Sequence, residues 1–279
     1  MSKEKQKKGK VLQILIWLIL VAGIGCAGYG CWYFYEELQQ ERAKEELVEE
    51  VKKTTLADIE AAEFTGITDG VEPDIPDDIA TGDSENPIDF EKLQSYNDEL
   101  YAWIYIPDTR IDYPVAQHDG EDDYYLKRNM YGEPEFAGCI YTEKCNSKDF
   151  TDPNTVLYGH NMRNGSMFQN LHLFREEEFF EENQYIYVYT LRHRLTYHVF
   201  AAYEYDDRHI MNSFDFSDEE VFEEYIESIF HVRSMNANIR EDENVTKDDK
   251  ILTLSTCVGG NPDARYLVQA VLVKDEKTK

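Results

Sequence analysis

Residues 11–35 restrict what this chain can fold into more than any other segment, because they include 25 consecutive positions without a charged side chain. Within a bilayer the backbone must satisfy its own hydrogen bonds, and an α-helix does so inside one segment. About 20 apolar residues are enough to cross the hydrocarbon core. The sequence therefore predicts a single membrane-spanning helix over residues 11–35.

The flanks of this segment predict its orientation. Residues 1–10 contain five lysines and one glutamate, a local charge of +4, and positive charge favours the cytoplasmic side of a membrane. The aromatic cluster 32–35 is typical of the opposite membrane–water interface. We expect a single-pass protein of the cell membrane, with a cytoplasmic basic tail (1–10) and the rest of the chain outside. A cleaved signal peptide or a lipid-modified Cys26 fits less well, because the stretch is long and no small-residue cleavage site or lipobox is evident.

The part of the chain beyond the predicted helix is strongly acidic. The whole chain carries −28 at neutral pH and residues 1–10 contribute +4, so the remainder carries −32. A nucleic-acid-binding protein would be basic, so no nucleic-acid partner is expected. The charge instead keeps an extracellular domain soluble and repels it from anionic lipid and wall polymers.

Cysteine usage argues against a disulfide framework. Of five cysteines, Cys26 and Cys31 lie in the predicted membrane helix, and Cys139, Cys145 and Cys257 remain outside. An odd number of thiols in an extracellular domain raises the question of which one is reactive. No Cys/His cluster has metal-ligand spacing, so neither a metal nor another cofactor is expected.

Composition divides the remainder into a stalk, a linker and a domain. Residues 36–64 are rich in Glu, Lys, Gln and Ala, which favours a solvated helix. Residues 65–87 are acidic and interrupted by Pro and Gly, which is linker composition. We predict a helical stalk and acidic linker over 36–87 and one folded domain over 88–279, whose 192 residues suit a single core.

The domain has the pattern of a β-protein. In segments such as 185–189, tyrosines alternate with aliphatic residues, as expected for a strand whose two faces have different surroundings. A short helix is expected over 90–100. Eight short strands with few helices favour a closed β-barrel. The candidate strands are 103–106, 110–115, 137–141, 155–158, 185–191, 194–205, 251–256 and 266–273.

One further helix is predicted in the long insertion between the sixth and seventh strands. Ser217 and Glu220 match a capping box. Apolar residues then recur at helical spacing and form one stripe, which can pack on the barrel, face a groove, or do both. The stripe consists of Val221, Phe222, Tyr225, Ile226, Ile229 and Phe230.

Three reactive side chains lie at strand ends. Cys257 ends the run Thr-Leu-Ser-Thr-Cys (253–257), Arg265 precedes the last strand, and His160 follows the strand 155–158. A thiol, an imidazole and a guanidinium are the groups needed to cleave an acyl bond through a thioester. Each alone has an ordinary interpretation, as a small buried residue, a satisfied core histidine or a surface cation. We favour catalysis because all three occur together. The remaining histidines, 118, 172, 193, 198, 209 and 231, are assigned no function.

These motifs resemble the sortases, cysteine transpeptidases of Gram-positive cell surfaces. The run Tyr-Gly-His-Asn-Met…Gly-Ser-Met-Phe (158–168) is similar to class B in particular, and 136–141 fits except that a small hydroxyl residue is more usual at Cys139. The resemblance implies an eight-stranded sortase-type barrel in which the insertion helix forms a wall of the substrate groove. The loop 258–264 is short for class B. Pilus-polymerising class C enzymes are disfavoured, because neither their lid plug nor a second membrane helix is expected here.

The resemblance also implies a function. A membrane-anchored cysteine transpeptidase would cleave the sorting signal of a surface protein through a Cys257 thioester and transfer the protein to a peptidoglycan amine. Arg265 would stabilise the oxyanion, and His160 would protonate the departing amine. Ser255, Thr256 and the helix residues Val221, Tyr225 and Ile226 are expected to contact the substrate peptide.

Two alternatives remain open on the residues alone. An extracellular thiol protease would use the same Cys257 and His160 but resolve the thioester with water. A non-catalytic scaffold could also be built on a sortase barrel. The resemblance implies Asn-Pro-x-Thr-Asn-like or Pro-x-Thr-Gly-like sorting signals, but the chain's own sequence identifies neither the signal nor the acceptor amine.

Overall fold

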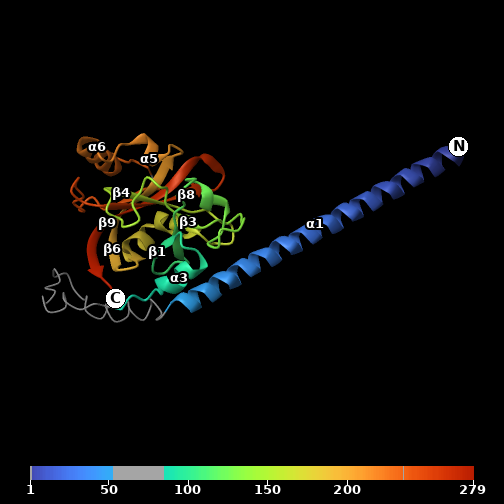
Figure 1. The fold of residues 1–279 in the computed structure, drawn as a ribbon. Helices are drawn as coiled ribbons and strands as arrows, with labels where there is room; N and C mark the ends of the chain where they lie inside the picture. The colour runs from blue at the N-terminus through green and yellow to red at the C-terminus, as the bar shows by residue number, and fades with distance from the viewer. Residues whose placement is uncertain (1, 53–84, 235) are drawn as a thin grey trace. The chain divides into compact units, whose positions relative to one another are not determined.

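A computed structural model of the chain describes residues 2–52, 85–234 and 236–279, which fall into two compact units. The first unit is helix α1 (Ser2–Val51), and its stretch Trp17–Tyr35 is long and apolar enough to cross a membrane (Figure 1). The helix continues into the predicted stalk as far as Val51. The rest of the predicted stalk and most of the predicted linker, 53–84, lie outside the described residues.

The second unit is a mixed β-barrel. Eight strands follow the order β5-β1-β2-β3-β4-β8-β9-β6, and pairing of β5 with β6 closes the ring. The β2–β3 and β4–β8 pairs are parallel, and the other pairs of the ring are antiparallel. The strands are β1 (Leu100–Tyr105), β2 (Asp112–Ala116), β3 (Ile140–Tyr141), β4 (Asn154–Tyr158), β5 (Tyr185–Thr190), β6 (His193–Asp206), β8 (Ile251–Val258) and β9 (Asn261–Lys277).

The predicted eight-stranded barrel is confirmed, with one addition. A ninth strand, β7 (Asn238–Ile239), pairs with β6 outside the ring. Two residues are too few to show a period-two pattern, so the sequence did not reveal it. Strand β3 is also shorter than predicted, and β9 is longer.

The helices of this unit are short except for one. The predicted helix over 90–100 ends at Tyr96, because β1 begins at Leu100. Asp89 accepts a hydrogen bond from the Lys92 backbone and begins that helix. The described helices are α3 (Phe90–Tyr96), η2 (Tyr124–Lys127), η3 (Phe168–Arg175), α4 (Glu177–Glu182), α5 (Ile210–Ser213) and α6 (Glu219–Phe230).

Helix α6 has a different N-cap from the one predicted. The carboxylate of Asp218, not the hydroxyl of Ser217, accepts from the backbone amides of Glu220 and Val221. Ser217 instead donates to Asp215. Both residue types cap helices well, and the chain uses the one a residue later than the capping-box prediction.

Alternation along the strands separates two hydrophobic clusters. On β8, Leu252 and Leu254 point into the barrel core, whereas Ile251 belongs to a second cluster on the outer face. That outer cluster includes Phe222 and Ile229 of α6, and α5 and α6 lie together on this side of the barrel (Figure 1). Each such side chain stabilises the fold by roughly 1.5–3 kcal/mol when fully buried. The long insertion therefore covers part of the outer face of β4, β8 and β9.

Candidate active site

Cys257 and Arg265 are direct partners in the sheet. The strands β8 and β9 form a hairpin in which Cys257 pairs with Arg265 and Ser255 with Leu267. The turn is tight at Gly259–Gly260, where Gly260 has φ +80, so the predicted loop 258–264 is largely strand. Residues opposite each other in an antiparallel pair project from the same face. The thiol and the guanidinium therefore share the outer face of the barrel.

His160 reaches the same place from the neighbouring strand. Strand β4 runs parallel to β8 with Tyr158 beside Ser255, and the Gly159 amide donates to the Ser255 carbonyl over 3.2 Å. His160 follows the end of β4 by two residues, and Cys257 lies two residues beyond Ser255 on β8. The parallel pairing therefore directs the backbone of both residues toward the same end of the sheet, although the two are far apart in sequence.

The surroundings of His160 fix its protonation pattern. Its Nε2 lies 2.7 Å from the carbonyl oxygen of Leu126. A carbonyl only accepts hydrogen bonds, so Nε2 carries a proton. The exposed ring of Phe136 stacks on the imidazole at 5.6 Å between ring centres. The Leu126 carbonyl therefore holds the imidazole through its Nε2 atom.

Arg265 is held by its own hairpin. Its Nη1 donates to the carbonyls of Pro262 at 2.9 Å and Ala264 at 3.0 Å. These bonds use only one nitrogen of the guanidinium fork. The planar group can therefore be held in place while it offers further donors to an oxyanion.

The three thiols of the barrel unit, Cys139, Cys145 and Cys257, lie in different environments. Burial raises the pKa of the Cys139 thiol to about 12. Partial burial, together with the carboxylates of Glu143 and Asp122, raises the pKa of Cys145 to about 11. Both therefore stay protonated at neutral pH, and the thiolate is the nucleophilic form. Cys257 is exposed at the strand end.

The residues predicted to contact substrate lie in different environments in the structure. Ser255 lies on the same face as Cys257, two residues away, and is buried with 5% of its surface exposed. Val221 of α6 is half-buried. Thr256 is buried and alternates to the barrel interior, away from the face that carries Cys257, so its predicted contact with substrate stays a prediction.

Tyr225 and Ile226 also differ from expectation. Both are buried in the outer hydrophobic cluster, with 1% and 4% of their surface exposed. The Tyr225 hydroxyl accepts a hydrogen bond from Gln269 over 2.9 Å. The prediction that these two side chains face an open groove is therefore wrong for this structure. They pack α6 onto the sheet together with Phe222 and Ile229, whereas Val221 and Phe230 are half-buried.

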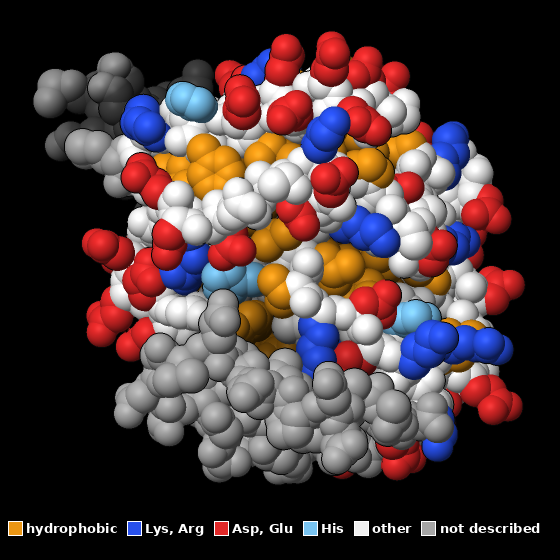
Figure 2. Space-filling view, turned by 90° about the vertical axis from the view of Figure 1, so that its left-hand side faces the viewer, with side chains coloured by type: hydrophobic (Ala, Val, Ile, Leu, Met, Phe, Trp, Pro, Cys, Tyr) orange, Lys and Arg blue, Asp and Glu red, His pale blue; other side chains and the backbone are white. Residues whose placement is uncertain are grey.

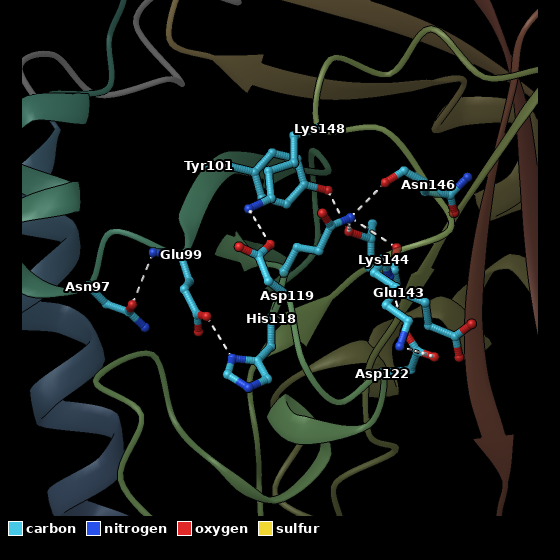
Figure 3. Close-up of polar contacts among 12 residues, drawn as sticks. Asn97, Glu99, Tyr101, His118, Asp119, Asp122, Glu143, Lys144, Asn146 and Lys148 are labelled. Carbon is cyan, nitrogen blue, oxygen red and sulfur yellow. Dashed lines mark hydrogen bonds and ion pairs between the residues drawn. The ribbon is translucent and has the colours of Figure 1, made fainter.

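The other histidines mostly contact carboxylates. His118 faces Glu99, with 2.6 Å between Nδ1 and Oε1, in a polar cluster that joins the segments around 99, 118 and 143 (Figure 3). Similar pairs are His193–Asp275, His198–Glu243 and His209–Glu143. His172 is different, since it lies beside the backbone carbonyl of Cys257 together with Asn161. Neither Asn161 nor His172 was predicted as a site residue.

A cavity lies away from these reactive groups. It has a volume of about 670 Å³ and opens between the segment 145–154 and the segment 211–217. None of His160, Cys257 and Arg265 lines it. On the face drawn in Figure 2, Asp and Glu side chains surround a band of hydrophobic side chains, in keeping with the net charge of −28.

Comparisons with known proteins agree with this geometry. Residues 104–273 match the Sortase domain family. Sortase B of Listeria monocytogenes is 33% identical over 168 residues, which are 59% of this chain and 65% of that relative. The crystal structure of Clostridium perfringens sortase B superimposes with a TM-score of 0.60 at 32% identity and covers 66% of this chain and 100% of that one. The Staphylococcus aureus sortase B–substrate complex gives 0.59 at 28% identity and covers 67% and 85%.

A closed mixed barrel with a cysteine and an arginine paired on one hairpin, and a histidine at the end of the adjoining parallel strand, defines a class of thiol-dependent proteins. This chain belongs to the sortase family, and the class B resemblance predicted from its motifs is confirmed.

Proposed function

We propose that this protein is a membrane-anchored class B sortase that cleaves a sorting signal through a Cys257 thioester and transfers the product to an amine of the cell wall. The observation that carries the proposal is the meeting of three elements. Cys257 and Arg265 are paired across β8 and β9, and β4, which runs parallel to β8, ends at Tyr158, two residues before His160.

The reaction begins with the thiolate of Cys257 attacking a peptide carbonyl carbon. The carbonyl oxygen becomes an oxyanion, and the guanidinium of Arg265 lies on the same face to donate to it. His160 as an imidazolium keeps Nε2–H on the Leu126 carbonyl and offers Nδ1–H to the departing amine. The C–N bond then breaks and the thioester remains.

The second half reverses these roles. A wall amine attacks the thioester and loses its proton to Nδ1 of His160. The C–S bond breaks, the Cys257 thiolate is restored and an amide is formed. Water in place of the amine would give hydrolysis, so the distinction from a thiol protease lies in the acceptor.

The anchor assignment has separate support. The stretch Trp17–Tyr35 follows a lysine-rich N-terminal segment, which favours a cytoplasmic N-terminus and an extracellular barrel. Surface proteins with sorting signals and peptidoglycan precursor amines are the expected partners. Ser255 and Val221 remain the proposed side-chain contacts of the signal peptide, with Tyr225 and Ile226 supporting the groove wall from behind.

Peptide cleavage with and without an added amine tests the proposal. Full-length protein in detergent micelles is incubated with Asn-Pro-x-Thr-Asn and Pro-x-Thr-Gly peptides, with or without triglycine. We expect amine-linked product in wild type and in Cys145→Ala, and no product in Cys257→Ala or His160→Ala. Cleavage unaffected by amine would indicate a protease, and full activity of Cys257→Ala would refute the proposal.

A further inference from the structure

The backbone carbonyl of Cys257 is held by two side chains that come from outside its own strand. The Nδ2 of Asn161 donates to this oxygen over 2.8 Å, and the Nε2 of His172 lies 3.2 Å from it. The same two nitrogens, Nδ2 of Asn161 and Nε2 of His172, lie 3.0 Å apart. Three groups therefore form one small polar triangle directly behind the exposed thiol.

Asn161 belongs to the loop that carries His160. That loop is tied at both ends, because the Phe168 amide donates to the His160 carbonyl over 2.9 Å and Asn161 bridges to Met167. Met167 adopts φ +57 and its amide donates to the Tyr113 hydroxyl. A non-glycine residue in this region persists only where its surroundings fix it. The backbone of Asn161 is thus fixed, and its amide links the imidazole loop to the thiol strand.

His172 comes from η3 and completes the triangle from the other side. Its ring lies 4.9 Å from the ring of Tyr266, the residue next to Arg265. Burial and the nearby Arg175 guanidinium lower the pKa of His172, so the ring is neutral near pH 7. In one neutral tautomer Nε2 donates to the Cys257 carbonyl, and in the other it accepts from Asn161. Either bond ties η3 to the end of β8.

We propose that Asn161 and His172 are positioning residues of the reaction, which hold the Cys257 carbonyl and so fix the thiol relative to the His160 imidazole. This inference rests on the proposed function of Cys257 as nucleophile. A planar peptide unit whose oxygen is held by Asn161, with His172 bonded either to that oxygen or to Asn161, cannot rotate freely. The backbone that carries the Cys257 side chain is therefore fixed, which restricts the positions that its Sγ atom can take. Neither Asn161 nor His172 needs to touch the substrate for this role.

Four variants of the full-length protein in detergent micelles test the proposal. Asn161→Ala and His172→Leu each remove one corner of the triangle, and His172→Gln keeps an amide group near the position of Nε2. Asn86→Ala is the matched control, because Asn86 also donates to a carbonyl over 2.8 Å, that of Thr190 at the end of β5. The readouts are kcat and KM with the sorting peptide, and thermal unfolding.

A substrate-free readout accompanies the kinetics. Iodoacetamide labelling at neutral pH, followed by peptide mass spectrometry, gives the alkylation rate of Cys257 relative to that of Cys145 in the same molecule. Cys145 is exposed and lies outside the triangle, so it serves as an internal reference. This ratio measures the reactivity of the positioned Cys257 thiol without a peptide substrate, so it stays informative even if the reaction with peptides differs from the proposed function.

We expect kcat to fall by about 10- to 100-fold in Asn161→Ala and His172→Leu, the scale of a reacting group displaced by up to about 1 Å, while KM stays within about twofold. The Cys257/Cys145 alkylation ratio should fall by about threefold or more in both variants. His172→Gln should recover most of kcat, and Asn86→Ala should lower the unfolding temperature only.

Two results would overturn the inference: an unchanged alkylation ratio in Asn161→Ala and His172→Leu, or losses of kcat that only match those of Asn86→Ala. A His172→Gln variant as impaired as His172→Leu would remove His172 from the role. Activity retained by Cys257→Ala would refute the proposed function separately, and the alkylation ratio would still decide whether the triangle positions the thiol.

Discussion

The outer face of β4, β8 and β9 has one end that the insertion covers and one open end. Polar side chains form different kinds of hydrogen bonds at the two ends. At the covered end, Gln269 donates to the hydroxyls of Tyr225 and Thr253, and Thr253 donates to Asn154. These residues are almost fully buried. At this end the hydrogen bonds join one side chain to another, so these polar groups are bonded within the protein.

At the open end, the predicted catalytic groups are held through backbone atoms. His160 contacts the Leu126 carbonyl, and Arg265 contacts the carbonyls of Pro262 and Ala264. A side chain anchored on backbone keeps its orientation and still has donors or acceptors for a substrate. The same strands, with the same alternation, thus carry a network of bonded side chains where the insertion covers them and the proposed catalytic groups where it does not.

The largest effect is expected at Arg265. Arg265→Lys keeps the charge but loses the planar fork, and loss of one oxyanion donor typically costs about 10²–10³ in rate. We expect kcat/KM for peptide cleavage to fall on that scale. Arg240→Lys is the matched control, since Arg240 also donates to backbone carbonyls, those of Val199 and Phe180, away from the site. Near wild-type turnover in Arg265→Lys would mean that its charge alone suffices.

A smaller effect is expected at Ser255, where the two ends meet. Ser255→Ala should raise KM for the sorting peptide by about three- to tenfold, the equivalent of one hydrogen bond of about 1 kcal/mol. Alkylation of Cys257 by iodoacetamide should be unchanged, because the thiol itself is not touched. Unaltered KM would remove Ser255 from the proposed peptide-binding surface.

At the covered end the effect should appear in stability and not in catalysis. Tyr225→Phe removes the acceptor that Gln269 uses, which should lower the free energy of unfolding by about 1–2 kcal/mol. Values of kcat and KM should match wild type in the folded protein, as measured by denaturant titration and peptide kinetics. A selective rise in KM would show that Tyr225 reaches the substrate after all.

The smallest effect is a pH dependence at His172. Burial and Arg175 lower its pKa below the ordinary value of 6.5, so the folded state holds this ring neutral. As pH falls below about 6.5 the unfolded chain binds a proton there that the folded chain resists, and stability is lost. His172→Gln should therefore narrow the difference in unfolding temperature between pH 7.5 and pH 5.5. His231→Gln, at the exposed end of α6, is the control, and an equal change in both variants would contradict the assignment.

Much of the fold was predictable because its signals are local. Short apolar runs, several of them alternating, predicted the eight strands of the ring, and a hairpin necessarily brings Cys257 close to Arg265. The motif around His160 placed the third group through its resemblance to sortases. The strand and hairpin inferences depend on short segments whose neighbours in sequence are also neighbours in the sheet, whereas the inference on His160 depends on the resemblance.

The rest depends on contacts between distant segments. The stripe on α6 shows that one side is apolar, but whether Tyr225 meets the sheet or a groove depends on the path of the whole insertion. Asn161 and His172 lie 96 and 85 residues from Cys257. Nothing near them in sequence marks the contact, although Asn161 directly follows His160. The N-cap of α6 is equally hard to predict from sequence, because Ser217 and Asp218 are adjacent and both residue types cap helices well.

The central claim, that the open end carries the nucleophile, is tested most directly by trapping the acyl-enzyme. Full-length protein is mixed with the sorting peptide without amine, quenched in acid within the first turnover and analysed by intact mass and peptide mapping. We expect a thioester adduct on Cys257, absent in Cys257→Ala and discharged by added triglycine. An adduct on Cys139 or Cys145, or cleavage that proceeds in Cys257→Ala, would contradict it.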